Sequence, residues 1–370
     1  MQIFPADLFE EVSIRRIPLH NEDLRQGASQ IGRDARVARI TKSLQEINLP
    51  FLVDVHDTVA LTYIDGLSLC ENYFMEAVYA SGRFPCLFIG GSAVAKPGLI
   101  KTFIFDGRQI VENHAVTIFL KLRQGRSYGV FKSQNFEKTG QSFMVISADP
   151  DRRVAFSVVD NVTDEVRPFA QVLAETFNTT PIDVKAKMDG YSFGIEIENE
   201  LFVRAVKDVN AETGSVSFFC DINPGDRLEL LKSTDFVEQT KRDVALFLKD
   251  RPQPLGAILN DCLLRRRNNE SQLVGLSQIW PMPVAGFSTF GELFGININQ
   301  TLTALAFFNA EETAFRDPFI ADFPIRYARF LNSFFNRQDL SRANLMFAKK
   351  KLEEEAKRNS VFMKKTPEVL

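Results

Sequence analysis

The chain has 370 residues, of which 45% are hydrophobic and 25% are charged, with a formal net charge of −3. This balance provides no overall positive field for nucleic acid or an anionic membrane, and no apolar run approaches the roughly 20 residues of a membrane span. The four cysteines lie far apart without CxxC spacing, which argues against a zinc knuckle or a disulfide framework and favours a reduced, cytoplasmic setting.

Phenylalanine is the unusual component of the composition, with 34 Phe against 6 Tyr and 1 Trp. Phe offers bulk without a polar group, so a densely packed core accounts for most of these rings. The alternative is that some of them line an apolar ligand pocket. The sequence leaves both interpretations open.

The first third of the chain alternates between strand-like and helix-like segments. An apolar run over 58–64 ends in the turn signal Asp65-Gly66-Leu67-Ser68, and helical spacing over 71–79 leads to a second strand at 86–89. Strand, helix and strand within this length indicate a βαβ unit with two parallel strands. The other elements predicted here are a strand at 12–14, a helix over 34–47 and a hairpin over 102–119 with its turn at Asp106-Gly107.

Gly90 and Gly91 directly follow the second strand of this unit. We expect them in a loop, where backbone N–H groups could contact an anion or a ligand. The pair fits neither GxGxxG nor a Walker loop. A plain turn is the alternative interpretation.

A polar segment over 121–140, which contains three glycines, is the expected domain boundary. It divides the chain into residues 1–125, 126–335 and 336–370. The elements predicted after it are strands at 143–147, 154–159, 193–197, 201–206, 215–219 and 255–259, and helices at 166–177 and 235–248.

Residues 340–359 are highly charged and contain neither Gly nor Pro, which predicts an extended helix. This helix is either a solvated helix, or a signalling helix that leads to an output domain or packs between the subunits of a homodimer. The predicted fold class is therefore α+β or mixed α/β, with two sheet-containing halves, packed helices and an extended C-terminal helix.

The most informative stretch is Val284 to Glu292, followed by Asn299-Gln300-Thr301. It places glycines, hydroxyl groups, a carboxylate and amides between apolar strand-like runs. A core strand needs none of these polar groups, whereas a turn that lines a cavity does. We therefore expect a cavity-lining turn here.

The sequence contains few residues suited to catalysis or metal binding. The three histidines, His20, His56 and His114, are dispersed and have no metal-ligand spacing. Cys262 is a candidate nucleophile whose pKa Arg265 could lower, but no general base is evident, and a Cys that ends a buried strand is more often a core residue. We expect that the protein is not an enzyme.

Arg204 and Glu292 are candidate charges for ligand binding. Arg204 lies within an apolar strand pattern, so its side chain either faces outward or must be paired with an anion. Glu292 could accept an amine from a ligand or cap a helix. Together the two charges would suit a zwitterion such as an amino acid.

Several blocks of this sequence resemble the N- and C-terminal segments of the FIST sensory domain, in the family's order, from roughly residue 10 to 335. The blocks are Val59 to Gly91, Thr102 to Gly107, Phe202-Val203-Arg204, Asp221 to Asp226, Asp261 to Arg265, Gly286 to Glu292 and Asn299-Gln300-Thr301. On this resemblance residues 1–125 and 126–335 correspond to the two FIST segments.

The resemblance implies a cytoplasmic sensor that binds a small ligand, with amino acids proposed. It also implies partners such as a histidine kinase, a chemotaxis protein or a cyclic-nucleotide enzyme. One branch of the family comprises haem-binding nitric-oxide sensors that control a histidine kinase. Ile298 stands where the family often has His before Asn-Gln-Thr, which removes one polar or metal-binding group.

Three functions are consistent with these observations: a signal-transduction input domain with an amino-acid-like ligand between its two halves, a haem-binding nitric-oxide sensor, and an interaction scaffold without a small ligand. For haem, the candidate axial ligands are His56, His114 and Cys262. The residues expected to bind a small ligand are Arg204, Cys262, Arg265, Phe287, Ser288, Thr289, Gly291, Glu292, Asn299, Gln300 and Thr301, with Gly90 and Gly91.

Overall fold

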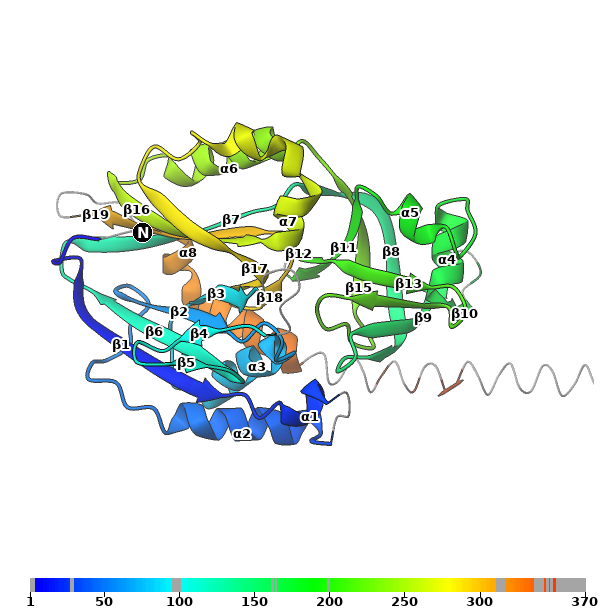
Figure 1. Ribbon diagram of the computed structural model, residues 1–370, viewed down its shortest axis with the longest axis horizontal. Coiled ribbons are helices and arrows are strands. Elements are labelled where there is room, and N and C mark those ends of the chain that lie inside the picture. The colour runs from blue at the N-terminus through cyan, green and yellow to red at the C-terminus, as the bar shows by residue number, and fades with distance from the viewer. Residues whose placement is uncertain are drawn as a thin grey trace, which may run out of the picture.

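The computed structural model describes residues 4–335, apart from 27–29, 95–100, 161–162, 164, 198–199 and 311–316, together with Ala343, Met346, Lys349 and Lys350. Two large sheets lie side by side, and helices pack around them (Figure 1). The fold is therefore mixed α and β, as the sequence predicts.

The first sheet combines strands from both ends of the described chain. Its strand order is β1-β6-β2-β3-β17-β16-β19-β7, and β18 pairs with β17. The bounds, in this order, are Phe9–Pro18, His114–Leu122, Thr58–Ile64, Phe88–Ala93, Val284–Phe294, Pro254–Cys262, Leu302–Asn309 and Arg126–Ser133, with β18 at Asn297–Ile298.

The second sheet uses only the middle of the chain. Its order is β12-β11-β15-β8-β9-β14-β13, and β10 pairs with β9. The bounds, in this order, are Glu200–Arg204, Tyr191–Ile197, Arg227–Ser233, Phe136–Asp149, Val154–Asp160, Ser215–Phe218 and Val206–Asn210, with β10 at Glu165–Pro168. A separate hairpin joins β4, Ile104–Phe105, to β5, Ile110–Val111.

Helices connect the strands of both sheets. They are α1 Glu22–Arg25, α2 Arg33–Gln45, α3 Glu71–Ser81, α4 Phe169–Thr176, α5 Val184–Lys187, α6 Phe236–Leu248, α7 Leu263–Asn268, the 3-10 helix η1 Glu270–Leu276 and α8 Pro318–Ala321. Residues 323–335 are also helical. In Figure 1, α2 lies along one side of the first sheet and α6 along the opposite side of the molecule.

The first sheet is built from two halves with the same topology. One half runs β1, α2, β2, α3, β3, β6, and the other runs β7, α6, β16, α7, β17, β19, with the second sheet inserted between β7 and α6. Each half contains a parallel pair, β2 with β3 or β16 with β17. The halves meet where β3 pairs antiparallel with β17. The predicted βαβ unit at β2-α3-β3 is confirmed, and a second one is present at β16-α7-β17.

Phenylalanine rings form a cluster in each sheet. Phe84 packs against Phe88 and Phe119 beside the first sheet. Phe193 packs against Phe143 and Phe169 in the second sheet. These clusters agree with the packed-core interpretation of the Phe excess. Phe218, Phe219 and Phe290 line a cleft, and the ligand-pocket interpretation for such rings stays a prediction.

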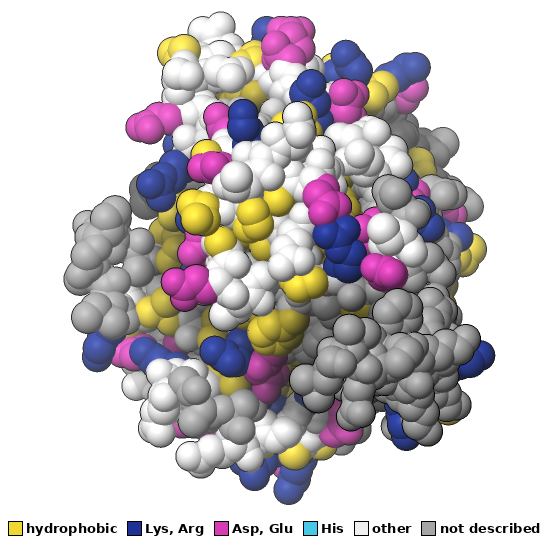
Figure 2. All heavy atoms as spheres, turned by 90° about the vertical axis from the view of Figure 1, so that its right-hand side faces the viewer, with side chains coloured by type: hydrophobic (Ala, Val, Ile, Leu, Met, Phe, Trp, Pro, Cys, Tyr) yellow, Lys and Arg dark blue, Asp and Glu magenta, His cyan; other side chains and the backbone are white. Residues whose placement is uncertain are grey.

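The end of the molecule that the second sheet forms carries charges of both signs. Figure 2 shows Lys and Arg interspersed with Asp and Glu across the described part of this face, with hydrophobic side chains in small groups between them. This arrangement agrees with the nearly balanced charge of the chain.

Two stretches expected as turns are strands. Gly90 and Gly91 lie inside β3, and the stretch from Val284 to Glu292 lies in β17. The glycines serve close strand approach, because a Cβ on Gly90 would lie 1.8 Å from the Thr62 carbonyl oxygen and one on Gly286 would lie 2.1 Å from that of Leu259. The pairing of β17 with β3 shifts register between Thr289 and Glu292, and this irregularity accommodates the polar stretch within the sheet.

The change of sheet falls between β7 and β8, inside the polar segment over 121–140, because β7 pairs with β19. Two other predictions differ from the observed elements. The helix predicted over 166–177 begins at Phe169, since β10 precedes it. Each strand of the hairpin around Asp106-Gly107 is only two residues long, and β6, which is expected to continue it, pairs with β2 instead.

The extended helix predicted over 340–359 lies outside the described residues, except for Ala343, Met346, Lys349 and Lys350, which are helical.

Candidate functional site

A cleft of about 410 Å³ lies between the two sheets, and we call it the inter-sheet cleft. The turn before α3, the turn between β8 and β9, the end of β14 and the β17–β18 segment all reach it. Its lining residues are Leu24, Gly66, Leu67, Leu69, Glu71, Asp151, Arg152, Arg153, Lys207, Phe218, Phe219, Phe290, Gly291, Asn297 and Asn299. Apolar walls with a few convergent polar groups are typical of a small-molecule site.

Two buried amides face each other across Gly291. Asn297 is 4% and Asn299 1% exposed, and neither Oδ1 has a hydrogen-bond partner among the described residues. The Nδ2 of Asn299 donates to the Phe290 carbonyl at 3.5 Å. A Cβ on Gly291 would lie 2.9 Å from Asn299 Nδ2 and 3.1 Å from Asn297 Oδ1, so only glycine leaves both amides in place. Two unsatisfied buried acceptors favour a ligand that donates hydrogen bonds.

An ion pair joins the two sheets at this cleft. Arg153, in the β8–β9 turn, donates from Nη2 to Glu71 Oε2 at 2.6 Å, and Ser92 Oγ donates to Glu71 Oε1 at 2.9 Å. The Nη1 of Arg153 donates to the Phe219 carbonyl at 2.5 Å. Although burial disfavours the charged guanidinium, the Glu71 carboxylate raises the pKa of Arg153 above its usual value. The cleft therefore holds a positive and a negative group side by side.

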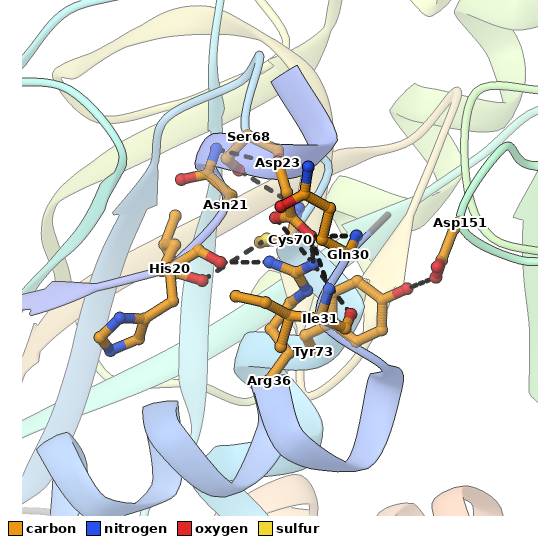
Figure 3. A network of polar contacts seen from close by, with 11 residues as sticks. His20, Asn21, Asp23, Gln30, Ile31, Arg36, Ser68, Cys70, Tyr73 and Asp151 are labelled. Carbon is orange, nitrogen blue, oxygen red and sulfur yellow. Dashed lines mark hydrogen bonds and ion pairs between the residues drawn. The ribbon is translucent and has the colours of Figure 1, made fainter. Parts of the chain in front are cut away.

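A second contact between the sheets lies next to this pair. Tyr73 of α3 donates its hydroxyl to Asp151 of the β8–β9 turn (Figure 3). Behind Tyr73, Arg36 binds Asp23 at 2.8 Å and also donates to the His20 and Ile31 carbonyls. Burial would raise the pKa of Asp23, but hydrogen bonds from Arg36 and from the backbone of Ile31 and Gln30 hold it well below its usual value. The first turn of α3 is thus held against both sheets.

Four of the predicted site residues form a buried cluster behind the cleft. Thr289 Oγ1 donates to Glu292 Oε1, Cys262 Sγ lies 3.8 Å from the Phe290 carbonyl, and Thr301 Oγ1 donates to the Asn299 carbonyl at 2.7 Å. All four residues are at most 1% exposed. They support the cleft wall and do not line it.

Burial sets the protonation states in this cluster. It raises the pKa of Glu292 well above its usual value and also raises that of the Cys262 thiol. Burial therefore favours the neutral form of Glu292, which makes it a poor counter-charge for a ligand ammonium. Cys262 remains a thiol, which makes it a core residue and not a nucleophile.

The other predicted residues occupy different places. Arg204 is 1% exposed and faces inward, where its Nη1 donates to the Asn297 carbonyl at 2.6 Å. Phe287 is 42% exposed and packs on Tyr63, 4.8 Å between ring centroids, with Ser288 beside it. Arg265 and Gln300 line a second cleft. Gly291 and Asn299 are thus the predicted residues that line the inter-sheet cleft.

The three candidate haem ligands lie apart. His56 is exposed and contacts Asp54 at 2.7 Å, before β2. His114 begins β6, beside the opposite end of β2. Cys262 is fully buried. Each is a separate candidate for a single axial ligand, and the haem alternative stays a prediction. No group of three or more potential metal ligands occurs in the part of the chain that the structure describes.

The sequence did not single out several cleft residues. Glu71 is the first residue of a helix that follows the turn at Asp65-Gly66, a position where ligand contacts are common, and Asn297 lies two residues before Asn299. Arg153 and Lys207 belong to no recognisable motif, and they reach the cleft only because the second sheet packs against the first.

Comparison with known families gives two adjoining matches. Residues 7–158 match the model of the FIST N domain, and residues 169–295 match that of the FIST C domain. A search of curated proteins finds no match. Within the described residues, no helix has both the length and the apolar character needed to cross a membrane.

Proposed function

The chain belongs to the FIST domain family, whose members are sensory domains in signal transduction, and from this premise we propose that the inter-sheet cleft binds its signal. The ligand we propose is a small zwitterion of the amino-acid type. The observation that carries the proposal is the pair of buried amides, Asn297 and Asn299, whose Oδ1 atoms have no partner among the described residues and which line a cleft that also holds Glu71 and Arg153.

The chemistry of the cleft matches the parts of an amino acid. The guanidinium of Arg153 and the ammonium of Lys207 suit a carboxylate, and the free Oδ1 atoms of the two amides suit an ammonium group. Leu67 and Phe290 would contact an apolar side chain. In this proposal the charges are those of Arg153 and Glu71, in place of Arg204 and Glu292.

The signal would be transmitted through the relative position of the two sheets. The lining residues come from both sheets, so a ligand contacts both at once. A ligand that binds one arrangement more tightly than another shifts the population toward it. The partner we propose is a signalling protein such as a histidine kinase, a chemotaxis protein or a cyclic-nucleotide enzyme. Capture of such a purified partner should change on ligand addition, and capture that ignores the ligand would contradict this part.

The test of the site is a thermal-shift screen of the common amino acids, followed by calorimetric titration of those that raise the melting temperature. Gly291→Ala should weaken binding by at least about tenfold, because the added Cβ displaces both amides. Gly32→Ala is the matched control, since a Cβ there would meet nothing within 4 Å.

A second variant, Asn299→Ala, keeps the test decisive if Gly291→Ala does not fold. It removes an amide from the cleft without adding volume. Binding that survives both variants would place the ligand elsewhere. The absence of any ligand in the screen would favour an interaction scaffold without a small ligand.

A further inference from the structure

We infer that a second cleft, beside α7, binds the oxyanion of a small carboxylate or phosphate ligand. This α7 cleft has a volume of about 320 Å³ and lies between α7, the α5–β11 segment and the β12–β13 connection. It is distinct from the inter-sheet cleft, although Lys207 lines both.

The floor of the α7 cleft is polar and buried. Asn135, Ser192, Arg265 and Gln300 line it, and their exposed fractions are 3%, 1%, 1% and 6%. Burying polar groups is unfavourable unless they are hydrogen-bonded. Each of the four residues has a partner within the protein, so what remains for a ligand is the hydrogen-bonding capacity that these bonds leave unused.

Within the part of the chain that the structure describes, the floor offers free donors, together with one free acceptor, the Oδ1 of Asn135, whose Nδ2 donates to the Thr234 carbonyl at 3.1 Å. Gln300 Oε1 accepts from Ser192 Oγ at 2.7 Å, and among the described residues its Nε2 has no partner. Arg265 uses Nη1 on Asp261 at 3.0 Å and Nη2 on Thr240 at 2.7 Å, while its Nε has no partner in the described structure. The free donors of Gln300 and Arg265 favour an anion.

The charges at the rim point to the same ligand class. Lys185 is neutralised by Asp208 at 2.6 Å, and Asp189 is the carboxylate that lines the cleft. Lys207 forms none of the ion pairs found among the described residues, although its charge also acts on Asp208. A lining cation beside the free donors of Gln300 and Arg265 suits an oxyanion.

The backbone at Gln300 adds an independent observation. Its φ is 49°, in the left-handed region that a residue with a side chain seldom adopts. With this conformation the side-chain amides of two consecutive residues lie in different clefts: Asn299 lines the inter-sheet cleft and Gln300 lines the α7 cleft. Such strain is concentrated at functional sites.

Methyl NMR of methionine tests the proposal with a local probe. Met188 lines the α7 cleft, whereas Met282 is buried near Ala257 in a separate apolar cluster. Inorganic phosphate and succinate are titrated separately into the full chain in chloride buffer. We expect a saturable shift of the Met188 resonance, with no shift of Met282, and the anion that saturates at lower concentration identifies the ligand source.

Gln300→Glu provides the variant, because it keeps the shape and the acceptor for Ser192 but replaces the free donor with a carboxylate. The apparent affinity should fall by at least about tenfold. Gln141→Glu, the same change at an exposed position of β8, should leave it unchanged. If Gln300→Glu does not fold, Lys207→Met should weaken binding instead.

The proposal is overturned if neither anion shifts Met188, or if Gln300→Glu and Gln141→Glu bind alike. It does not rest on the function proposed for the inter-sheet cleft. Met188 does not line that cleft, so failure of one site leaves the other untouched.

Discussion

At the scale of single residues, burial decides the chemistry of the polar cluster behind the inter-sheet cleft. Glu292 is fully buried in β17, and its one described side-chain partner is the Thr289 hydroxyl on Oε1, while Oε2 has none. A carboxyl in this position is stabilised in its neutral form. The polar residue types in the sequence predict a cavity-lining site, but their protonation follows from an environment that the sequence does not display.

The raised pKa of Glu292 gives folding stability a defined pH dependence. Burial favours the protonated form in the native state, whereas the unfolded chain ionises near 4.5. The native state then binds more protons, so above that pH stability falls, by up to about 1.4 kcal/mol per pH unit, until the native pKa is reached. We expect Glu292→Gln to remove this slope, as measured by urea unfolding between pH 5 and pH 8.

Glu238→Gln is the control, because Glu238 lies on the solvent side of α6 with a side chain that is 64% exposed. The free energy of unfolding of this variant should change with pH in the same way as that of the parent protein. A Glu292→Gln profile parallel to the parent would show that Glu292 does not carry a buried proton.

At the scale of the elements, glycines set how closely strands approach. β3 pairs with β2 on one side and with β17 on the other. A Cβ on Gly91 would lie 2.6 Å from Thr289 Cγ2 and 2.7 Å from the Gly291 carbonyl oxygen. The sequence predicts a ligand-binding loop at Gly90 and Gly91, but in the structure these glycines allow close strand approach where the two halves of the first sheet meet.

Gly90→Ala separates the strand interpretation from the loop interpretation. A Cβ at this position would lie 1.8 Å from the Thr62 carbonyl oxygen, so the β2–β3 pairing must shift. We expect a loss of more than about 3 kcal/mol in the free energy of unfolding, or failure to fold. Urea unfolding measures this. A loss below about 1 kcal/mol would mean that Gly90 tolerates a side chain as an open loop does.

At the scale of the whole molecule, few polar contacts join α3 to the second sheet. The Glu71–Arg153 pair and the Tyr73–Asp151 hydrogen bond both connect α3 to the β8–β9 turn. The side chains of Glu71 and Arg153 are 4% and 14% exposed. In the proposed ligand site, Arg153 would contact both the ligand and Glu71, the residue through which it joins α3 to the second sheet.

A double-mutant cycle with Glu71→Ala and Arg153→Ala measures this connection. Each single change leaves a buried charge unpaired and should destabilise the protein by about 3–5 kcal/mol. The coupling energy from urea unfolding should lie at the upper end of the usual range, near 2–3 kcal/mol.

The comparison pair is Lys185–Asp208, which joins α5 to β13 of the second sheet and has side chains that are 60% and 58% exposed. Solvent screening should keep its coupling below about 1 kcal/mol. Equal coupling in the two pairs would contradict a role for Glu71 and Arg153 in holding the sheets together.

Several parts of this fold could be predicted from local spacing. The apolar run over 58–64, the turn at Asp65-Gly66 and the helical pattern after it gave β2, α3 and the parallel pairing with β3, because periodicity and turn chemistry act over a few residues. Asp235 likewise marks the start of α6, where its side chain accepts the Glu238 N–H at 2.8 Å.

The repeated topology of the first sheet has no counterpart in an evident sequence repeat. β7 and α6, which correspond to β1 and α2, are separated in the chain by the whole second sheet. That insertion hides the repeat from a reading in chain order.

The sequence by itself determined the kind of residues involved: FIST-like blocks, glycine-bearing strands and polar groups in apolar surroundings. Only the tertiary structure decided which of them meet. Glu71 and Arg153 lie far apart in the chain and share no motif, and Asn299 and Gln300 are adjacent yet line different clefts. Local propensity acts between near neighbours, whereas a cleft is formed by the packing of distant segments, and that packing also sets burial, pairing and charge.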